Sequence, residues 1–476
     1  MRWIPSALIP ALFATLAMSP SSWAQGSEVA DAAATGLPES ATAQDALTTH
    51  LEGGLGFGAV EEDLFFTFNF GTAFQFSKWS LGVQIPLRFR IHDEAPLCKD
   101  DCVLRTEDWD EFHDYLRILR YLQYGAPRDP FYLRVGEFNG VSMGHATVVD
   151  RYYNVVDLNH YKLGLRTTVD FGYGGVEFLV DDIAPPSIVG LRTYFRPMTV
   201  FSSDPLAVGE ESDALQRIAT GLFFVGDLSA PSGVLTADST ENPISSQKAQ
   251  AVFYGWDVEW EIIATKMLEV VPYLDVVGFN GLGMGTHLGS FVNVHMPLDM
   301  HLDTRLEYRF ATAHYQPSYF NSLYEIERFS FPSAEGVFRT KFDHFEGAVG
   351  DEGLESRHGV LGSLDYRWGT YLAVGGTYED YPGDGNANLT LRTALPYIFG
   401  FKFAAQYTKR NFDNLSQVFD LDGALLVASA RYMVYGPGFV SANYAQQWHL
   451  VTDQNGETEY ESTSAWSLGG GVELAF

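Results

Sequence analysis

Cysteine is scarce in this sequence: there are two in 476 residues, Cys98 and Cys102, close together in an acidic stretch. So few cysteines exclude a fold held by several disulfides, and one close pair does not supply the two Cys pairs of a structural zinc site. We expect Cys98 and Cys102 to close one small disulfide loop. The alternative is a metal site built from both thiolates and nearby carboxylates, but no second Cys pair or His cluster lies near, so we expect no metal.

Basic residues are also few, with 30 Lys and Arg against 60 Asp and Glu and a net charge of −30. Binding to nucleic acid depends on Lys and Arg that neutralise phosphate, so a nucleic-acid partner is excluded. Acidic residues crowd around the cysteines, for example Asp100, Asp101 and Asp108. Carboxylates at such density can hold Ca²⁺, but no spacing here matches a known calcium loop. We expect them chiefly to keep surface loops solvated.

Long apolar runs are missing. Residues 7–18 form an apolar stretch of about 12, interrupted by Pro10, which is shorter than the roughly 20 that a spanning helix needs. Arg2 precedes the stretch and Ser22-Trp23-Ala24 follows it, with small residues at the two positions that a signal peptidase reads. We predict a signal peptide at 1–24 and no transmembrane helix in the mature chain. Residues 25–48 are small and polar and predict a flexible periplasmic leader.

What the sequence does contain is a two-residue alternation of apolar and polar side chains. In residues 64–76, Phe66, Phe68 and Phe70 fall on one face and Thr67 and Asn69 on the other, and the alternation recurs in 161–171, 252–262, 302–310 and 399–407. These segments have the length of tilted membrane strands, whereas strands of soluble sandwiches most often have about 5–6 residues. The mean hydropathy of −0.06 is then the average of a lipid-facing and a lumen-facing surface.

The connections fall into two classes, as they do in membrane barrels, where periplasmic turns are short and surface loops longer. The predicted periplasmic turns are at Ser77-Lys78, 125–129, Gly172-Tyr173, Thr265-Lys266, Pro297, Gly369, Pro396 and Gly436-Pro437. The predicted surface loops are at about 92–111, 139–159, 227–248, 312–357 and 452–460. One connection disagrees, because 198–213 is a long turn on the periplasmic side. The count is about 20 strands, and we allow 16 to 20, an even number.

The end of the chain carries an independent signal. Trp466, Leu468, Val472 and Leu474 share one face of the last segment, and the chain stops on Phe476. This resembles the closing strand of Gram-negative outer-membrane β-barrels. The resemblance implies an all-β fold, a transmembrane antiparallel up-and-down β-barrel over 49–476, surrounded by lipid and lipopolysaccharide of the outer membrane. It also implies that the barrel-assembly machinery reads Phe476.

The polar face of each predicted strand lines the interior and is rich in charge. Basic residues lie mostly on the third to eighth strands, and acidic residues on the tenth and, alternating with Arg, on the thirteenth. The predicted pore-lining set is Arg88, Arg90, Arg134, Lys162, Arg166, Arg192, Arg196, Asp257, Glu259, Glu261, Asp303, Arg305, Glu307 and Arg309. A basic wall facing an acidic wall would set up a transverse field that orients solutes. Alternatively, these groups pair and fill a closed interior, although about 16 or more strands usually enclose more space than side chains fill.

The segment 139–160 lies between the fifth and sixth predicted strands. In general porins the loop at this place folds inward and narrows the pore, and this chain is similar to them there in loop order and length. His145, Asp150, Arg151 and Asp157 are the candidate constriction residues. The alternative is an ordinary surface loop or a strand extension.

The resemblance implies a porin-like channel for passive diffusion of small polar or charged solutes, without a cofactor. Alternatives are a hydrophobic-substrate transporter, a barrel hydrolase acting on lipid or peptide, and a structural or adhesive barrel with a filled lumen. Residues 25–48 lack the apolar hatch that the transporter requires. His301 and Asp303 point the same way, but no serine-hydrolase, metalloprotease or phosphate-loop motif accompanies them, so we expect no enzyme. A homo-oligomer is left open, and so are the solute and its charge.

Overall fold

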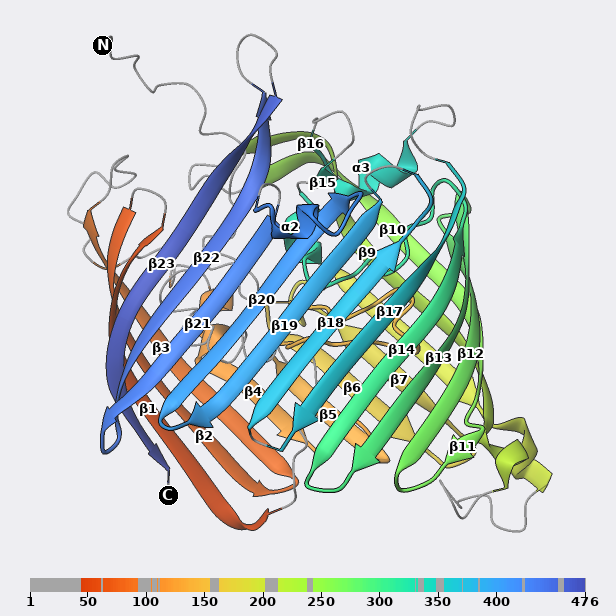
Figure 1. Cartoon of the computed structure of the whole chain (residues 1–476), viewed down its shortest axis with the longest axis horizontal. Coiled ribbons are helices and arrows are strands. Elements are labelled where there is room, and N and C mark those ends of the chain that lie inside the picture. Colours follow the sequence, from red (N-terminus) through yellow and green to blue (C-terminus); the bar gives the residue numbers. More distant parts are fainter. Residues whose placement is uncertain are drawn as a thin grey trace.

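The computed structural model of the chain is a closed antiparallel β-barrel (Figure 1). It describes residues 44–60, 63–92, 104, 109, 112–154, 162–201, 213–237, 243–329, 331–332, 338–347, 355–369, 371–383, 386–421, 424–452 and 458–475. Each strand pairs with its neighbours in the chain, and β1 pairs with β23 to close the sheet. Counting the two-residue β11 with β10, both of which pair with β12, gives 20 strands. The predicted all-β membrane barrel is confirmed, at the upper end of the predicted strand range.

The long strands lie at the two ends of the chain and in its middle. In chain order the barrel strands are β1 (Gln44–Val60), β2 (Asp63–Ser77), β3 (Trp79–His92), β4 (Leu119–Tyr124), β5 (Phe131–Gly136), β6 (Gly164–Asp170), β7 (Gly174–Val180), β8 (Ile188–Phe195), β9 (Ile218–Ala237), β10 (Pro243–Trp260), β11 (Ile263–Ala264), β12 (Leu268–Phe279), β13 (Gly283–Met296), β14 (Met300–Ala311), β17 (Arg357–Trp368), β18 (Leu372–Asp380), β19 (Ala387–Ile398), β20 (Phe401–Phe412), β21 (Ala424–Tyr435), β22 (Gly438–Thr452) and β23 (Thr458–Ala475). The connections contain β15 (Phe331–Pro332), β16 (Phe338–Arg339), α2 (Tyr324–Glu327), α3 (Lys341–Glu346) and the 3₁₀ helices η2 (Phe112–Ile118), η3 (Pro197–Phe201), η5 (Ala214–Arg217) and η6 (Gln417–Phe419).

The strands form because their side chains alternate between two environments. On β2, Phe66, Phe68 and Phe70 are each 38% exposed on the outer face, whereas Thr67 between them is 1% exposed. Phe66 pairs with Phe89 and Phe68 with Leu87 on β3, so apolar outer positions stay in register from strand to strand. A register slip by one residue would turn the apolar set into the lumen, so the pattern holds the pairing. A closed barrel with such an apolar belt spans the outer membrane of Gram-negative bacteria.

Most predicted turns lie where the structure has them, and three boundaries differ. The turn predicted at Pro396 is at Phe399-Gly400, and Pro396 lies within β19 at a break in register between Leu395 and Ile398. Proline has no N–H to donate to a neighbouring strand. A proline therefore fits a β-bulge as well as a turn, and the sequence alone could not distinguish the two.

The predicted loop 227–248 is wrong, because β9 and β10 extend through most of it and pair with register shifts. The barrel starts at Gln44 rather than 49.

Two long connections on the surface side decide what fills the interior. The inner loop joins β5 to β6 and is described for residues 137–154 and 162–163. The cap loop joins β14 to β17 over residues 312–356 and contains α2, β15, β16 and α3 at the top of the barrel in Figure 1. Strands β4 to β8, on either side of the inner loop, have only 6–8 residues, shorter than predicted.

An apolar core inside the barrel is the main feature that alternation did not predict. It joins inner-loop residues such as Val149 to inward residues of β10 and β12, Phe253 and Phe279, and to cap-loop aromatics such as Phe320. The rings of Phe253 and Phe279 stack with centroids 4.6 Å apart, and both side chains are fully buried. The two loops are therefore packed against the wall as a globular core would be, rather than lying loosely over the mouth.

Candidate pore constriction

The inner loop doubles back on itself before it reaches the wall. Val141 and Tyr152 exchange two backbone hydrogen bonds of 2.9 and 2.8 Å, and the Asn154 side chain accepts from the Phe138 N–H at 2.7 Å. Gly144, at the turn, has a φ of +54°, and a Cβ there would lie 3.1 Å from the Arg192 side chain. Both the left-handed backbone and the close approach to the wall therefore favour glycine at this position.

The first contact of the inner loop with the wall is made by His145. Its Nδ1 donates to Asp275 on β12 at 2.7 Å and its Nε2 to Glu259 on β10 at 2.6 Å, and the ring stacks on Tyr273 with centroids 4.4 Å apart. Thr147 donates to the second oxygen of Asp275 at 2.8 Å. Burial alone would lower the pKa of His145, but the hydrogen bonds and charges of Asp275 and Glu259 raise it to about 9. His145 is thus a buried imidazolium held between two carboxylates.

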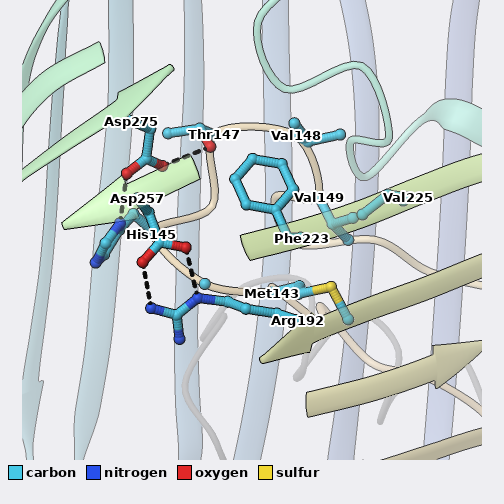
Figure 2. A pocket seen from close by; sticks show the side chains of 11 residues that line it. Met143, His145, Thr147, Val148, Val149, Arg192, Phe223, Val225, Asp257 and Asp275 are labelled. Atoms are coloured by element: carbon cyan, nitrogen blue, oxygen red, sulfur yellow. Dashed lines mark hydrogen bonds and ion pairs between the residues drawn. The ribbon is translucent and has the colours of Figure 1, made fainter. Parts of the chain in front are cut away.

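Beside His145, the guanidinium of Arg192 holds the wall together. It donates two hydrogen bonds to Asp257, at 2.9 and 2.8 Å, and one to Glu177 at 2.7 Å. Arg192 lies on β8 and Asp257 on β10, and the strand between them carries Gly221, where a Cβ would meet the Asp257 carboxylate at 2.8 Å. Figure 2 shows His145, Arg192 and Asp257 at a narrow crevice that the inner loop also lines and that has room for about one water molecule.

The second contact lies on another part of the wall. Arg151 donates to Asp365 on β17 at 2.5 Å and to Thr377 on β18 at 2.7 Å, and Arg392 on β19 donates to the other oxygen of Asp365 at 2.9 Å. The neighbouring Asp150 accepts from Arg305 on β14 at 3.2 Å. His145 is bound to β10 and β12, whereas Arg151 is bound to β17 and β18. The inner loop therefore crosses part of the lumen and is held at both ends of the crossing.

The third contact joins the inner loop to the cap loop. Val149 and Phe320 form a parallel bridge, with the Asp150 N–H donating to the Phe320 carbonyl at 3.0 Å. The Tyr152 hydroxyl donates to Glu325 of α2. Lys162, at the far end of the inner loop, donates to Glu325 at 2.7 Å and to Asp181 at 2.8 Å. These contacts link the inner and cap loops to each other as well as to the wall.

The residues of β14 form a ladder of alternating charge. Arg305 donates to Glu307 at 2.6 Å, Glu307 also accepts from Arg309, and Arg309 donates to Glu379 on β18 at 2.6 Å. Two further groups contact Glu307: the Tyr273 hydroxyl on β12 donates to the carboxylate, and the Nδ1 of His287 on β13 lies 2.9 Å from it. Arg305, Glu307 and Arg309 are therefore paired with neighbouring charges of the same side of the barrel.

The other residues of the predicted pore-lining set are more scattered. Arg134 donates to the Glu137 carbonyl at 2.8 Å, Arg166 donates to the Ser142 carbonyl of the inner loop at 3.1 Å, and Arg196 is paired with Asp170 at 2.9 Å. Arg88 is buried, Arg90 lies 5.7 Å from the centre of the Phe65 ring, and Asp303 stands opposite Asp365 across β14 and β17. Glu261 follows β10 at the periplasmic end, and its N–H donates to the Arg217 carbonyl at 3.4 Å.

One prediction differs from the structure, and four others lie outside the described residues. Lys162 precedes β6 instead of lining it, because β6 starts at Gly164. Asp157, Phe476 and the cysteine pair lie outside the described residues, as does the segment 1–43 that contains the predicted signal peptide. The disulfide and the signal peptide therefore stay predictions.

Sequence reasoning missed the partners on the wall. Asp275 and Asp365 are buried carboxylates on the inner faces of β12 and β17, and a carboxylate at an inner position was a usable signal for a buried partner. The sequence could not show which residue the partner is, because Arg151 and Asp365 are far apart in the chain. The aromatic run of the cap loop, Tyr315, Tyr319, Phe320 and Tyr324, was a second signal, since a solvated loop does not need four large rings.

The described ranges contain no group of three or more His, Cys, Asp or Glu side chains that could hold a metal ion. No helix within them is both long and apolar enough to cross a membrane.

No protein-family model and no curated protein matches this chain. Similar solved structures include three from Pseudomonas aeruginosa. OccK11 (OpdR) is 10% identical with a TM-score of 0.35, over 90% of this chain and 96% of that one. OpdK with vanillate is 9% identical with a TM-score of 0.35, over 91% and 100%. OccK2 (OpdF) in complex with glucuronate is 10% identical with a TM-score of 0.33, over 90% and 98%.

Proposed function

We propose that this protein is a porin-like channel of the outer membrane, for passive diffusion of small polar or charged solutes, and not an enzyme. The observation that supports the proposal most is the inner loop, held by His145 at one part of the wall and by Arg151 at another, inside a closed barrel of 20 strands. A loop anchored in this way narrows a lumen without being the wall itself.

The size of the barrel supports an open path. About 8 strands enclose just enough space for side chains, whereas 16–18 strands leave an aqueous channel. The apolar core of the inner and cap loops lies against β7 to β10, β12 and β14. The described residues of the strands β20 to β23 contribute nothing to this core, and their inward side chains include buried polar or charged groups, among them Gln406, Arg431, Asn443 and Ser467. A path beside the core would therefore be polar.

The apolar core does not support the hydrophobic-transporter alternative. Phe253, Phe279 and Phe320 are fully buried and packed against each other, so they offer no surface to a passing apolar solute.

Planar-bilayer recording of the purified protein tests the proposal. We expect stepwise single-channel currents in KCl, and a reversal potential under a salt gradient that reports the charge preference. Heat-unfolded protein at the same concentration is the control for detergent artefacts. Folded protein that inserts but gives no current, and liposomes that do not swell in small sugars, would refute the channel and favour a barrel with a filled lumen.

A further inference from the structure

The connection between β8 and β9 is unlike the other described periplasmic turns. Those are short, whereas this one runs from Arg196 to Arg217 and contains η3 and η5. In Figure 1 its yellow-green ribbon extends outward from the lower rim of the barrel. A long periplasmic connection is uncommon in such barrels, so it calls for a reason.

This connection is attached to the lipid-facing side of the wall. Trp260 lies on the outer face of β10, in register with outer residues of its neighbours, and its indole N–H donates to the Ala214 carbonyl of η5 at 2.9 Å. The Glu261 N–H donates to the Arg217 carbonyl at 3.4 Å. Because the partner is an outward tryptophan, η5 lies beside the membrane-facing surface and not beneath the lumen.

The start of the connection is held firmly. Arg196 forms a salt bridge with Asp170 at 2.9 Å, and its N–H donates to the Tyr173 carbonyl at 2.8 Å. The Thr199 hydroxyl donates to the Arg196 carbonyl at 2.6 Å, and Thr199 is buried. The chain therefore leaves the wall in a defined direction, with Val200 and Phe201 projecting from it.

The side chains that project are apolar. Phe201 is 85% exposed, Val200 65% and Leu215 58%. Large apolar groups held out into water cost free energy, and a patch of them usually marks a contact surface. The outer residues next to this patch, Phe195 and Trp260, belong to the lipid-facing belt, so the patch continues the belt beyond the ends of the strands.

We propose that η3 and η5, the described parts of the β8–β9 connection, lie on the periplasmic leaflet of the outer membrane, with Val200, Phe201 and Leu215 in contact with phospholipid. We infer lipid as the partner of this apolar patch because the patch is continuous with the lipid-facing belt and is attached to Trp260. A surface beside the belt lies against the lipid leaflet, which is nearer than any periplasmic protein. Aromatic and aliphatic side chains on one side of a short segment bind the headgroup–acyl boundary in this way.

The test places an environment-sensitive probe at three positions in the full-length barrel. Cys98→Ser and Cys102→Ser supply a cysteine-free background, into which Phe201→Cys, Leu288→Cys or Asp299→Cys is introduced and labelled with the fluorophore NBD. Leu288 faces outward in the middle of β13, and Asp299 lies in the short turn between β13 and β14. The proteins are reconstituted in vesicles of phosphatidylethanolamine and phosphatidylglycerol containing doxyl lipids.

We expect the NBD probe at position 201 to emit at short wavelength, as the probe at position 288 does. A shallow doxyl lipid should quench the probe at 201 at least about twice as strongly as the probe at 299. Emission and quenching at 201 that match those at 299 would overturn the proposal, and would leave a periplasmic protein as the partner to seek. Heat-modifiable mobility on gels establishes that each labelled barrel is folded. Val200→Cys replaces Phe201→Cys if the latter does not fold.

Discussion

At the scale of single residues, His145 is the side chain whose charge state matters most to the inner loop. Its pKa of about 9 exceeds the ordinary value of about 6.5, so the folded chain binds the proton more tightly than the unfolded one. The stabilisation is fully present below about pH 6.5 and is lost as pH rises through about 9. The groups facing the ring are Asp275, Glu259 and Tyr273, with Arg192 3.9 Å from Glu259.

The first prediction concerns pH. Raising the pH from about 6.5 to above about 9 deprotonates His145, and we expect larger current fluctuations in bilayer recordings because the inner loop loses one attachment. His145→Gln can never carry the charge, so its fluctuations should be high at every pH and show no step in this interval. A step of equal size in His145→Gln would assign the effect to another group.

The second prediction concerns Arg151. Arg151→Met leaves Asp365 with Arg392 alone and removes the inner loop from β17 and β18. We expect a loss of about 2–5 kcal/mol in unfolding free energy, measured in urea with the protein in lipid vesicles, and a higher single-channel conductance.

Arg128→Met is the matched control, because Arg128 pairs with Glu269 but its side chain is 70% exposed. Exposed pairs contribute at most about 1 kcal/mol, so stability and conductance should stay close to those of the unchanged protein. If both variants behave alike, the Arg151 contact does not hold the loop.

At the scale of elements, the cap loop depends on a buried ion pair. Lys341 at the start of α3 is 1% exposed, and its Nζ donates to Glu327 of α2 at 2.5 Å and to the Tyr319 carbonyl at 2.7 Å. Burial would raise the pKa of Glu327, but the charges of Arg410 and Lys341 lower it to about 2. The Glu327 carboxylate therefore stays ionised, and its contact with Lys341 joins two short helices that could not hold their positions by themselves.

The third prediction is that Lys341→Met loosens the cap loop. Removing one partner leaves the Glu327 carboxylate buried beside Arg410 alone, at a cost of about 3–5 kcal/mol. Limited proteolysis of the folded barrel should then cut within the cap loop faster than in the unchanged protein. Lys78→Met is the control, since Lys78 pairs with Asp129 in an exposed turn. A cap loop that is cut no faster would show that its apolar core is sufficient.

Two strands of the wall use glycine to let charges meet across them. Gly221 on β9 leaves the space in which Arg192 and Asp257 pair, and Gly375 on β18 does the same for Asp365 and Arg392. A Cβ at 375 would lie 2.0 Å from the Asp365 carboxylate. Pairing across an intervening strand requires this gap, because inward side chains of the middle strand would otherwise separate the partners.

At the scale of the whole molecule, an arginine introduced on the lipid-facing surface should reduce stability far more than one introduced on the lumen-facing surface. Leu288→Arg puts a charge on the outer face of β13, and we expect a loss of about 2–4 kcal/mol. Asn293→Arg, on the inner face of the same strand between Glu269 and Asp303, should change stability far less. Urea unfolding in lipid vesicles measures both, and equal losses would contradict the assignment of the two faces.

The sequence by itself determined the barrel. Alternation has a period of two, so the positions of Phe66, Thr67 and Phe68 decide which face meets lipid, and the alternation of short and long connections decides which end is periplasmic. Both are local properties of the chain, and they predicted the class, the direction of the strands and nearly the correct turns. Pro396 was ambiguous because the same missing N–H suits a turn and a bulge.

Only the tertiary structure decided what the interior holds. His145 and Asp275 are 130 residues apart, and Arg151 and Asp365 are 214 apart, so no local pattern joins them. The interior of the barrel can be lined by polar side chains or filled by an apolar core, and which of the two occurs at a given place depends on which loops fold inward. Closure of the sheet brings these distant residues within hydrogen-bond distance, and the burial that follows gives each contact its strength.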